Sequence, residues 1–113
     1  MLPRENRLKK EEDFKKIFKK GRGFTNDLLV LKVIKNNLDI SRFAFVISKK
    51  ISKKATVRNR IKRRLDNIIR ADLPKIKKGW DGIIIALPDI ENKKFEILKK
   101  DAESLLKRTG LLK

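Results

Sequence analysis

The first hydrophobic pattern in the chain has the spacing of a helix. Within residues 11–20, Phe14, Ile17 and Phe18 fall on one side and lysines occupy most of the rest, which is the amphipathic pattern of a surface helix. Gly21 follows the last periodic residue, where glycine commonly ends a helix. We therefore predict a helix over residues 11–20 whose aromatic stripe faces the interior or a groove.

Extended patterns follow this helix. Residues 23–34 are rich in apolar side chains, and the asparagine pair 36–37 after them supplies turn chemistry. Residues 42–48 alternate between two faces, and one of these faces carries the large apolar side chains of Phe43, Phe45 and Ile47. The first half of the chain thus predicts two or three strands.

The second half of the chain predicts a helix, a strand and another helix. Thr56 is placed to cap a helix that runs to about residue 72, and the apolar stripe of this helix consists of Val57, Ile61, Leu65, Ile68 and Ile69. Residues 83–87 are apolar without alternation, which is typical of a central strand covered on both faces. A last helix over residues 95–108 ends before Gly110, and its apolar side carries Phe95, Leu98, Ala102 and Leu105.

The order of these elements indicates the fold class. A helix, two or three strands, a helix, a strand and a helix predict an α+β or α/β sandwich with helices packed on a small sheet. The 113 residues suit a single domain, residues 1–113, with one modest core. A crossover between parallel strands would be right-handed by the general rule, which holds for about 98% of such connections.

Composition adds a strong charge imbalance. The chain has 32 Lys and Arg against 14 Asp and Glu, which gives a net charge of +18. Such a charge opposes compaction unless a polyanion neutralises it, so nucleic acid is the natural partner. The longest apolar run, residues 83–87, is far shorter than the roughly 18 residues of a membrane-spanning helix. The chain begins without an apolar signal segment, and we expect a cytoplasmic protein that does not enter a membrane.

Missing residue types restrict the chemistry of the chain. Cys, His and Tyr are absent, which excludes thiol chemistry, disulfides, Cys/His zinc sites and His-based triads. The acidic residues form no compelling pair for general acid/base or metal chemistry. We therefore expect neither catalytic nor metal-binding residues in the protein itself.

The positive charge is concentrated at one place in the sequence. Ten of the 16 residues from Lys49 to Arg64 are Lys, Arg or Asn, in a loop and the first turns of the middle helix. A solvated helix face usually mixes signs, but this helix has only Asp66 and Asp72 to offset its cations. A helix N-terminus offers backbone N–H groups to phosphate, and arginine adds a planar fork that binds phosphate and stacks on bases. We predict that this segment contacts nucleic acid.

Within this cluster, Arg58-Asn59-Arg60-Ile61-Lys62-Arg63 resembles the RNR motif of the protein subunit of bacterial ribonuclease P. The likeness covers nearly the whole chain, because further segments follow the family's order and spacing: Arg7-Leu8-Lys9-Lys10, Asp13-Phe14, Ile17-Phe18-Lys19, Ser48-Lys49-Lys50, and Asp81 with Ile83-Ile84-Ile85-Ala86. The most specific part is the RNR segment, preceded by the Ser-Lys-Lys sequence and followed by a strand.

This resemblance implies a function and a more detailed fold. In the family, a small basic protein binds a large catalytic RNA, and the pair cleaves precursor tRNA to free its mature 5′ end. The hydrolysis belongs to the RNA and its bound Mg²⁺, and no obligate protein partner is expected. The implied fold is α+β and similar to ribosomal protein S5 domain 2, with a mixed sheet of about four strands and the order α-β-β-β-α-β-α. Its RNR helix lies in a left-handed crossover, and we follow the family on this point.

The resemblance also implies roles for particular residues. The catalytic RNA would contact Arg58, Asn59, Arg60, Lys62, Arg63 and Arg64, with Lys49, Lys50, Lys53 and Lys54 beside them. The single-stranded 5′ leader of precursor tRNA would lie in a cleft between the first helix and the sheet, at Phe14, Phe18, Val30 and Lys32. Bases stacked on aromatic rings with cations alongside are held with little sequence preference. Phe14 and Phe18 are equally compatible with positions in the core.

Other functions stay open on the sequence alone. A ribosomal or RNA-chaperone protein with a similar fold would bind RNA without any role in an enzyme. A DNA-binding regulator that places the middle helix in a major groove is less well supported, because no helix-turn-helix partner or dimer seam is evident. A protein-only nuclease would have to be active without RNA, which the missing catalytic residue types argue against.

Overall fold

The computed structural model of the chain describes residues 1–112 and has the predicted order of elements. Its helices and strands are α1 (Glu11–Lys20), β1 (Arg22–Thr25), β2 (Leu29–Lys35), β3 (Arg42–Val46), α2 (Ala55–Asp72), β4 (Trp80–Ala86) and α3 (Phe95–Arg108). Short 3-10 helices accompany them at η1 (Arg4–Asn6), η2 (Leu73–Lys75) and η3 (Pro88–Ile90). The order α-β-β-β-α-β-α is therefore confirmed.

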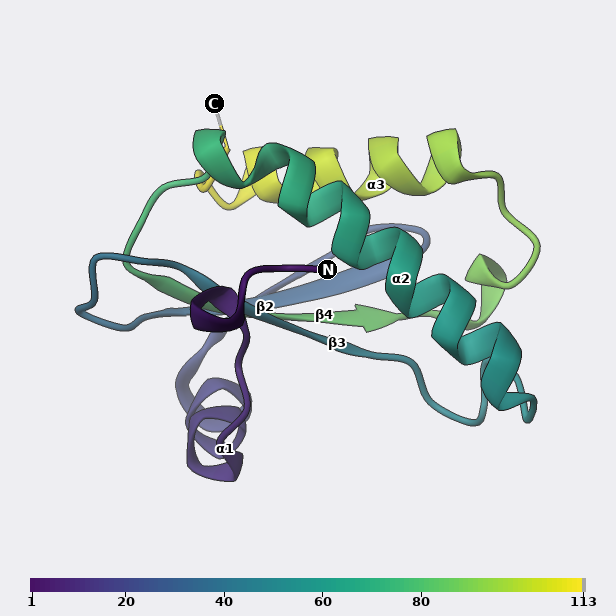
Figure 1. The fold of residues 1–113 in the computed structure, drawn as a ribbon, viewed down its shortest axis with the longest axis horizontal. Coiled ribbons are helices and arrows are strands. Elements are labelled where there is room, and N and C mark those ends of the chain that lie inside the picture. The colour runs from purple at the N-terminus through teal and green to yellow at the C-terminus, as the bar shows by residue number, and fades with distance from the viewer. Residues whose placement is uncertain (113) are drawn as a thin grey trace.

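The strands form one mixed sheet in the order β1-β2-β4-β3 (Figure 1). β1 and β2 form an antiparallel pair, β2 pairs antiparallel with β4, and β3 pairs parallel with β4. β4 therefore has a neighbouring strand on each side. This arrangement confirms the predicted central strand for residues 83–86, whereas Leu87 lies just beyond the end of β4.

The connection from β3 through α2 to β4 is left-handed. In Figure 1, β3 is the nearest strand of the sheet and runs to the right, and the chain then returns to the left through α2 above the sheet. It re-enters the sheet behind β3 as β4, which runs to the right again. The general preference for right-handed crossovers gives the wrong hand here, whereas the family resemblance gives the right one.

Helices cover both faces of the sheet, with α2 and α3 on one face and α1 alone on the other (Figure 1). Successive residues of a strand point to opposite faces, so Phe43 joins the core under α2 and α3 while Ala44 joins the core under α1. In β4, Ile84 joins the core under α2 and α3, and Ile83 joins the core under α1. The larger core thus lies beneath α2 and α3, and a smaller one lies beneath α1.

Gly82 in β4 makes room for an aromatic ring in the larger core. A Cβ atom on Gly82 would lie 2.9 Å from the ring Cε1 of Phe43 and 3.4 Å from a methyl group of Leu31. Phe43 pairs with Gly82 across the β3–β4 ladder and is only 1% exposed. The ring therefore fills the space that a side chain of β4 would otherwise occupy.

Two predicted helix features need correction. Thr56 does not cap α2, because the helix begins at Ala55 with Lys54 in the N-cap position. In the preceding loop the Ser52 hydroxyl accepts the Lys54 N–H at 3.2 Å, and the first helical bond already runs from the Arg58 N–H to the Lys54 carbonyl at 3.2 Å. The chain is thereby turned into the helix ahead of Thr56.

The second correction concerns the apolar stripe of α3. Phe95 is 41% exposed, whereas Leu98 is the first residue of this helix to be buried. The first turn of α3 therefore extends beyond the core that the rest of its stripe contacts. Helical spacing alone does not show where along a helix burial begins.

We expect Gly82→Ala to lower the free energy of unfolding by about 1–3 kcal/mol, because the added methyl group would force the Phe43 ring out of its position. Gly23→Ala in β1 is the matched control, since a Cβ there would lie 3.7 Å from the flexible side chain of Lys32, an ordinary contact. Urea unfolding measures both variants. Equal stabilities would contradict this account of the packing around Phe43.

Candidate nucleic-acid interface

The apolar side of α2 determines which of its residues reach solvent. Ile61, Leu65, Ile68 and Ile69 are buried in the larger core. The other sides of the first turns are consequently open to solvent, with Asn59, Arg60, Lys62 and Arg63 exposed and Arg64 half-buried. The predicted loop residues are exposed as well, namely Lys49, Lys50, Lys53 and Lys54.

Arg58 is one of two arginines of the predicted cluster, with Arg64, that are not fully exposed. It lies three and seven residues before Ile61 and Leu65, on the buried side of the helix, and is itself half-buried. Its guanidinium donates a hydrogen bond to the backbone carbonyl of Ser52 at 2.8 Å. Because Ser52 belongs to the loop before α2, Arg58 holds this loop against the helix, and one of its donors is used within the protein.

The acidic residues of α2 do not neutralise the exposed cations. Asp66 and Asp72 are each only 7% exposed, and an oxygen of Asp66 lies 3.7 Å from the amino group of Met1. The solvent-facing side chains in the first turns of α2 are therefore all cationic except for a few small or amide groups. We call this surface, formed by Asn59, Arg60, Lys62, Arg63 and Arg64, the basic face of α2.

Cations from a distant segment extend the basic face on the side of α3. Arg60 and Arg64 line a shallow pocket with Lys93 and Lys94, which precede α3, and with the neighbouring Glu91 and Asn92. The Arg64 guanidinium lies 3.5 Å from the backbone carbonyl of Lys93, to which it donates. Sequence analysis missed these two lysines because only the fold brings them beside α2.

A second extension lies on the other side of α2. Lys62 lines a pocket that also contains Lys9, Phe14 and Phe45. The pocket lies at the edge of β3, where Arg7 and Leu8 pair with Phe43, and so connects the basic face with the segment that leads into α1. The sequence analysis did not assign Lys9 to the site, although Lys9 belongs to residues 7–10, one of the segments that resemble the family.

The predicted leader residues lie on the opposite face of the sheet. Val30 and Lys32 are half-buried and alternate along β2 with buried residues of the larger core, so they point to the side of α1. The Lys32 ammonium lies 5.5 Å from the centroid of the Phe18 ring and donates to the Phe18 carbonyl at 3.4 Å. We call Phe14, Phe18, Val30 and Lys32 the leader surface.

The structure divides the aromatic stripe of α1 between the core and the surface. Ile17 is fully buried, and Phe18 is 46% exposed. Phe14 is half-buried, packs against the smaller core and also lines the pocket at the edge of β3. Phe18 is therefore a surface residue, whereas Phe14 packs against the smaller core and is still partly exposed to solvent.

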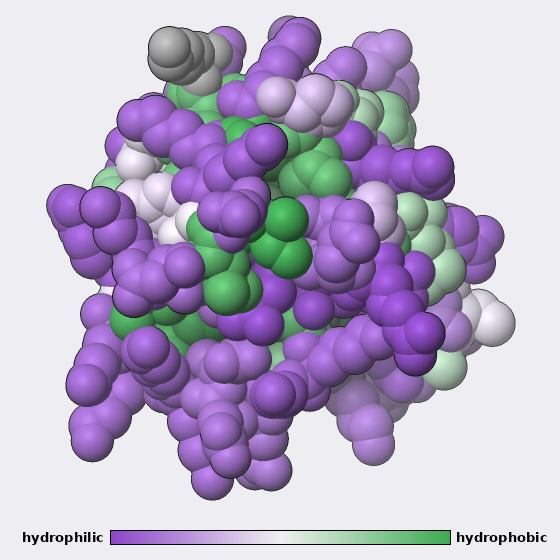
Figure 2. Space-filling view, turned by 60° about the vertical axis from the view of Figure 1, so that its left-hand side comes forward, coloured by the Kyte–Doolittle hydropathy of each residue, from purple (hydrophilic) through white to green (hydrophobic). Residues whose placement is uncertain are grey.

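Within residues 1–112, the exposed large hydrophobic side chains outside these sites are Met1, Leu38, Phe95 and Ile97. Figure 2 shows a side of the molecule that is mostly hydrophilic, with a small group of hydrophobic residues near its centre. Beside η1, an apolar pocket lies outside all predicted sites and is lined in part by Ile40, Leu73, Pro74 and Ile76.

These features define a small, strongly basic α+β protein of the RNA-binding class, with a cationic helix on one face of its sheet and an exposed aromatic ring beneath a lysine on the other. Residues 2–110 match the family model described as Ribonuclease P. The chain therefore belongs to the bacterial ribonuclease P protein family.

Relatives and solved structures agree with this assignment. The chain is 37% identical over 112 residues to the ribonuclease P protein component of a Synechocystis species, covering 98% of this chain and 90% of the relative. It is 38% identical over 105 residues to that of Clostridioides difficile, covering 92% and 91%. The Staphylococcus aureus RNase P protein superposes with a TM-score of 0.88 at 28% identity, covering 96% and 98% of the two chains. For the protein from Thermotoga maritima the TM-score is 0.83 at 35% identity, covering 90% and 96%.

Family membership confirms the resemblance found in the RNR segment and its flanking sequences. The chain is thus the protein subunit of a tRNA-processing ribonucleoprotein, and ribonuclease P RNA is its partner. Every helix within residues 1–112 is too short or too polar to cross a membrane.

We expect Arg63→Ala to weaken binding to ribonuclease P RNA and to reduce the slope of log affinity against log salt concentration by about one, because one phosphate contact is lost. Arg58→Ala should instead loosen the loop that Arg58 holds at Ser52, and so lower the melting temperature with a smaller change in slope. Filter binding at several salt concentrations and thermal unfolding separate the two effects. An unchanged slope for Arg63→Ala would place the RNA on another surface.

Proposed function

We propose that the basic face of α2 and the loop before it bind the catalytic RNA, while the leader surface binds the 5′ leader of precursor tRNA. The observation that carries this proposal is the burial of Asp66 and Asp72, which leaves the exposed part of the basic face without a negative charge. Such a surface repels itself in the free protein and is neutralised by phosphate. Lys49, Lys50, Lys53 and Lys54 add charge where the backbone N–H groups at the start of α2 also attract anions.

We assign the cleavage of the phosphodiester bond to the RNA partner. The chain lacks Cys and His, and residues 1–112 contain no group of three or more acidic side chains placed to hold a metal ion. These residues do not fit a protein-held Mg²⁺ site, so we attribute Mg²⁺ to the RNA and derive no step through it in the protein. The protein contributes cations that reduce phosphate repulsion, and a surface that holds the substrate.

The leader surface has the groups that a flexible single strand requires. Phe18 presents an exposed ring for base stacking, and Lys32 places a positive charge next to that ring. Stacking of this kind contributes roughly 1–3 kcal/mol per base and tolerates different sequences. We propose that the protein recognises precursor tRNA through this surface, in the cytoplasm where tRNA is made.

Cleavage of precursor tRNA at low Mg²⁺ tests the proposed function. We expect cleavage by cognate ribonuclease P RNA to increase strongly when this protein is added, because its cations replace part of the required Mg²⁺. A reaction with protein alone should give no product. Absence of stimulation with a competent RNA would favour a ribosomal or RNA-chaperone role, and cleavage by protein alone would contradict the assignment of chemistry to RNA.

We expect Phe18→Leu to reduce the preference of the holoenzyme for precursor over mature tRNA about fivefold to tenfold, through loss of one stacking contact. Phe95→Leu is the matched control, because Phe95 is a similarly exposed phenylalanine at the start of α3. Affinities of both variants for precursor and mature tRNA can be measured by competition binding. Equal preference in the two variants would remove Phe18 from the leader surface.

A further inference from the structure

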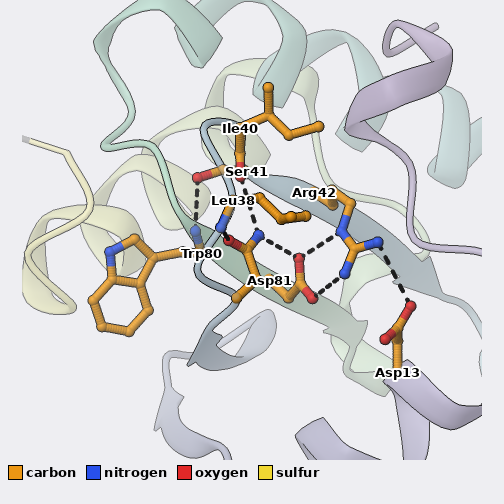
Figure 3. A network of polar contacts seen from close by, with 8 residues as sticks. Asp13, Leu38, Ile40, Ser41, Arg42, Trp80 and Asp81 are labelled. Atoms are coloured by element: carbon orange, nitrogen blue, oxygen red, sulfur yellow. Dashed lines mark hydrogen bonds and ion pairs between the residues drawn. The ribbon is translucent and has the colours of Figure 1, made fainter.

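A network of polar side chains joins both edges of β4 to α1 (Figure 3). Asp81 of β4 accepts hydrogen bonds from the Arg42 guanidinium, from Nε at 2.9 Å and from a terminal nitrogen at 2.6 Å. The same carboxylate accepts a bond from Asn36 at 2.8 Å, just beyond β2. The remaining terminal nitrogen of Arg42 lies 3.6 Å from a carboxylate oxygen of Asp13 in the first turn of α1.

The burial of this network fixes the direction of the Arg42 side chain. The Asp81 side chain is 6% exposed, and those of Arg42 and Asp13 are 22% and 25% exposed. The hydrogen bond to Asp81, followed by the charges of Asp81 and Asp13, raises the pKa of Arg42 against the opposing effect of burial. Two parallel hydrogen bonds hold the planar guanidinium in one orientation, so its third nitrogen is directed at α1.

Packing alone holds α1 less firmly than the other helices. α1 has ten residues, and Ile17 is its one fully buried side chain, whereas α2 and α3 pack against each other as well as the sheet. No side chain caps the N-terminus of α1. The ion pair between Asp13 and Arg42 therefore adds a directed polar contact in the first turn of a helix that has only one fully buried side chain.

The position of α1 also sets the geometry of the leader surface. Phe14 and Phe18 belong to α1, whereas Val30 and Lys32 belong to β2. A tilt of α1 on the sheet would change the distance between these two halves. Near the other end of α1, the Phe18 carbonyl accepts the bond from Lys32, so the helix has a polar contact to the sheet toward each end.

We propose that Asp13 and Arg42 are positioning residues for the substrate: their ion pair holds α1 at the tilt that places Phe14 and Phe18 opposite Lys32 for binding of a single-stranded leader. The inference rests on the proposed function of the leader surface. It assigns a role in substrate recognition to two residues that do not themselves belong to that surface. The basic face of α2 lies on the other side of the sheet, and neither Asp13 nor Arg42 lines the pocket that Lys62 shares with the beginning of α1. Binding of ribonuclease P RNA should therefore not depend on them.

Asp13→Asn tests the proposal in the reconstituted holoenzyme, because it removes the charge and keeps the size of the side chain. We expect affinity for leader-bearing precursor tRNA to fall about threefold to tenfold, with affinities for mature tRNA and for ribonuclease P RNA unchanged. Hydrogen exchange of the α1 amides should become faster, since the first turn loses its contact to the sheet. Asp13→Glu should restore much of the affinity.

Glu12→Gln is the matched control, because it removes the same charge from the same turn at an exposed side chain. Equal effects of Asp13→Asn and Glu12→Gln on precursor affinity would overturn the proposal, and so would an equal loss of mature tRNA binding. Failure of the proposed function itself would be seen before any variant is compared, as the absence of a preference for precursor over mature tRNA with the unmodified protein. In that case the positioning role is overturned with it.

Discussion

The architecture depends on burial of β4 on both of its faces. Ile83 and Ile84 are each almost fully buried and point to opposite sides of the sheet, so a layer of helices on one side alone would leave apolar surface in water. The two faces are covered to different extents: α2 and α3 cover one face, and the short α1 covers the other. The same requirement separates the two predicted RNA-binding surfaces, since α2 carries one and α1 carries half of the other.

Folding also removes three acidic side chains from the surface. Asp66, Asp72 and Asp81 are each no more than 7% exposed, and Asp81 is matched by the fork of Arg42. Cations of α2 and its loop meanwhile reach solvent along the helix and are joined by Lys93 and Lys94. The electrostatic character of the surface is thus more positive at α2 than the local sequence indicates. It results from where acidic side chains are buried as much as from the number of basic ones.

Periodicity predicted those elements whose burial follows a simple rule. The bounds of the first and last helices agree with the structure, and the unbroken apolar run at residues 83–87 identified the central strand. The pattern did not show that Ile51 is a core residue, because one isoleucine among lysines has no period. It also did not show that the helical hydrogen bonds begin at the Lys54 carbonyl, so the predicted cap at Thr56 was wrong. The hand of the crossover depends on how the whole chain packs, so only the family resemblance supplied it. The partners of Arg58 and Arg64 were equally hidden, since the contacts at Ser52 and Lys93 exist only after folding.

The separation of buried acids from exposed cations has a consequence for how the protein responds to its ionic surroundings. In the free protein, dissolved ions screen the repulsion among the side chains of the basic face, so a rise in ionic strength favours the folded state. In the complex that we propose, RNA phosphates already compensate the charge of the basic face, and the same rise in ionic strength weakens RNA binding. Binding to RNA stabilises the native chain by mass action. The folded protein is therefore supported by salt when alone and by its RNA partner when salt is low.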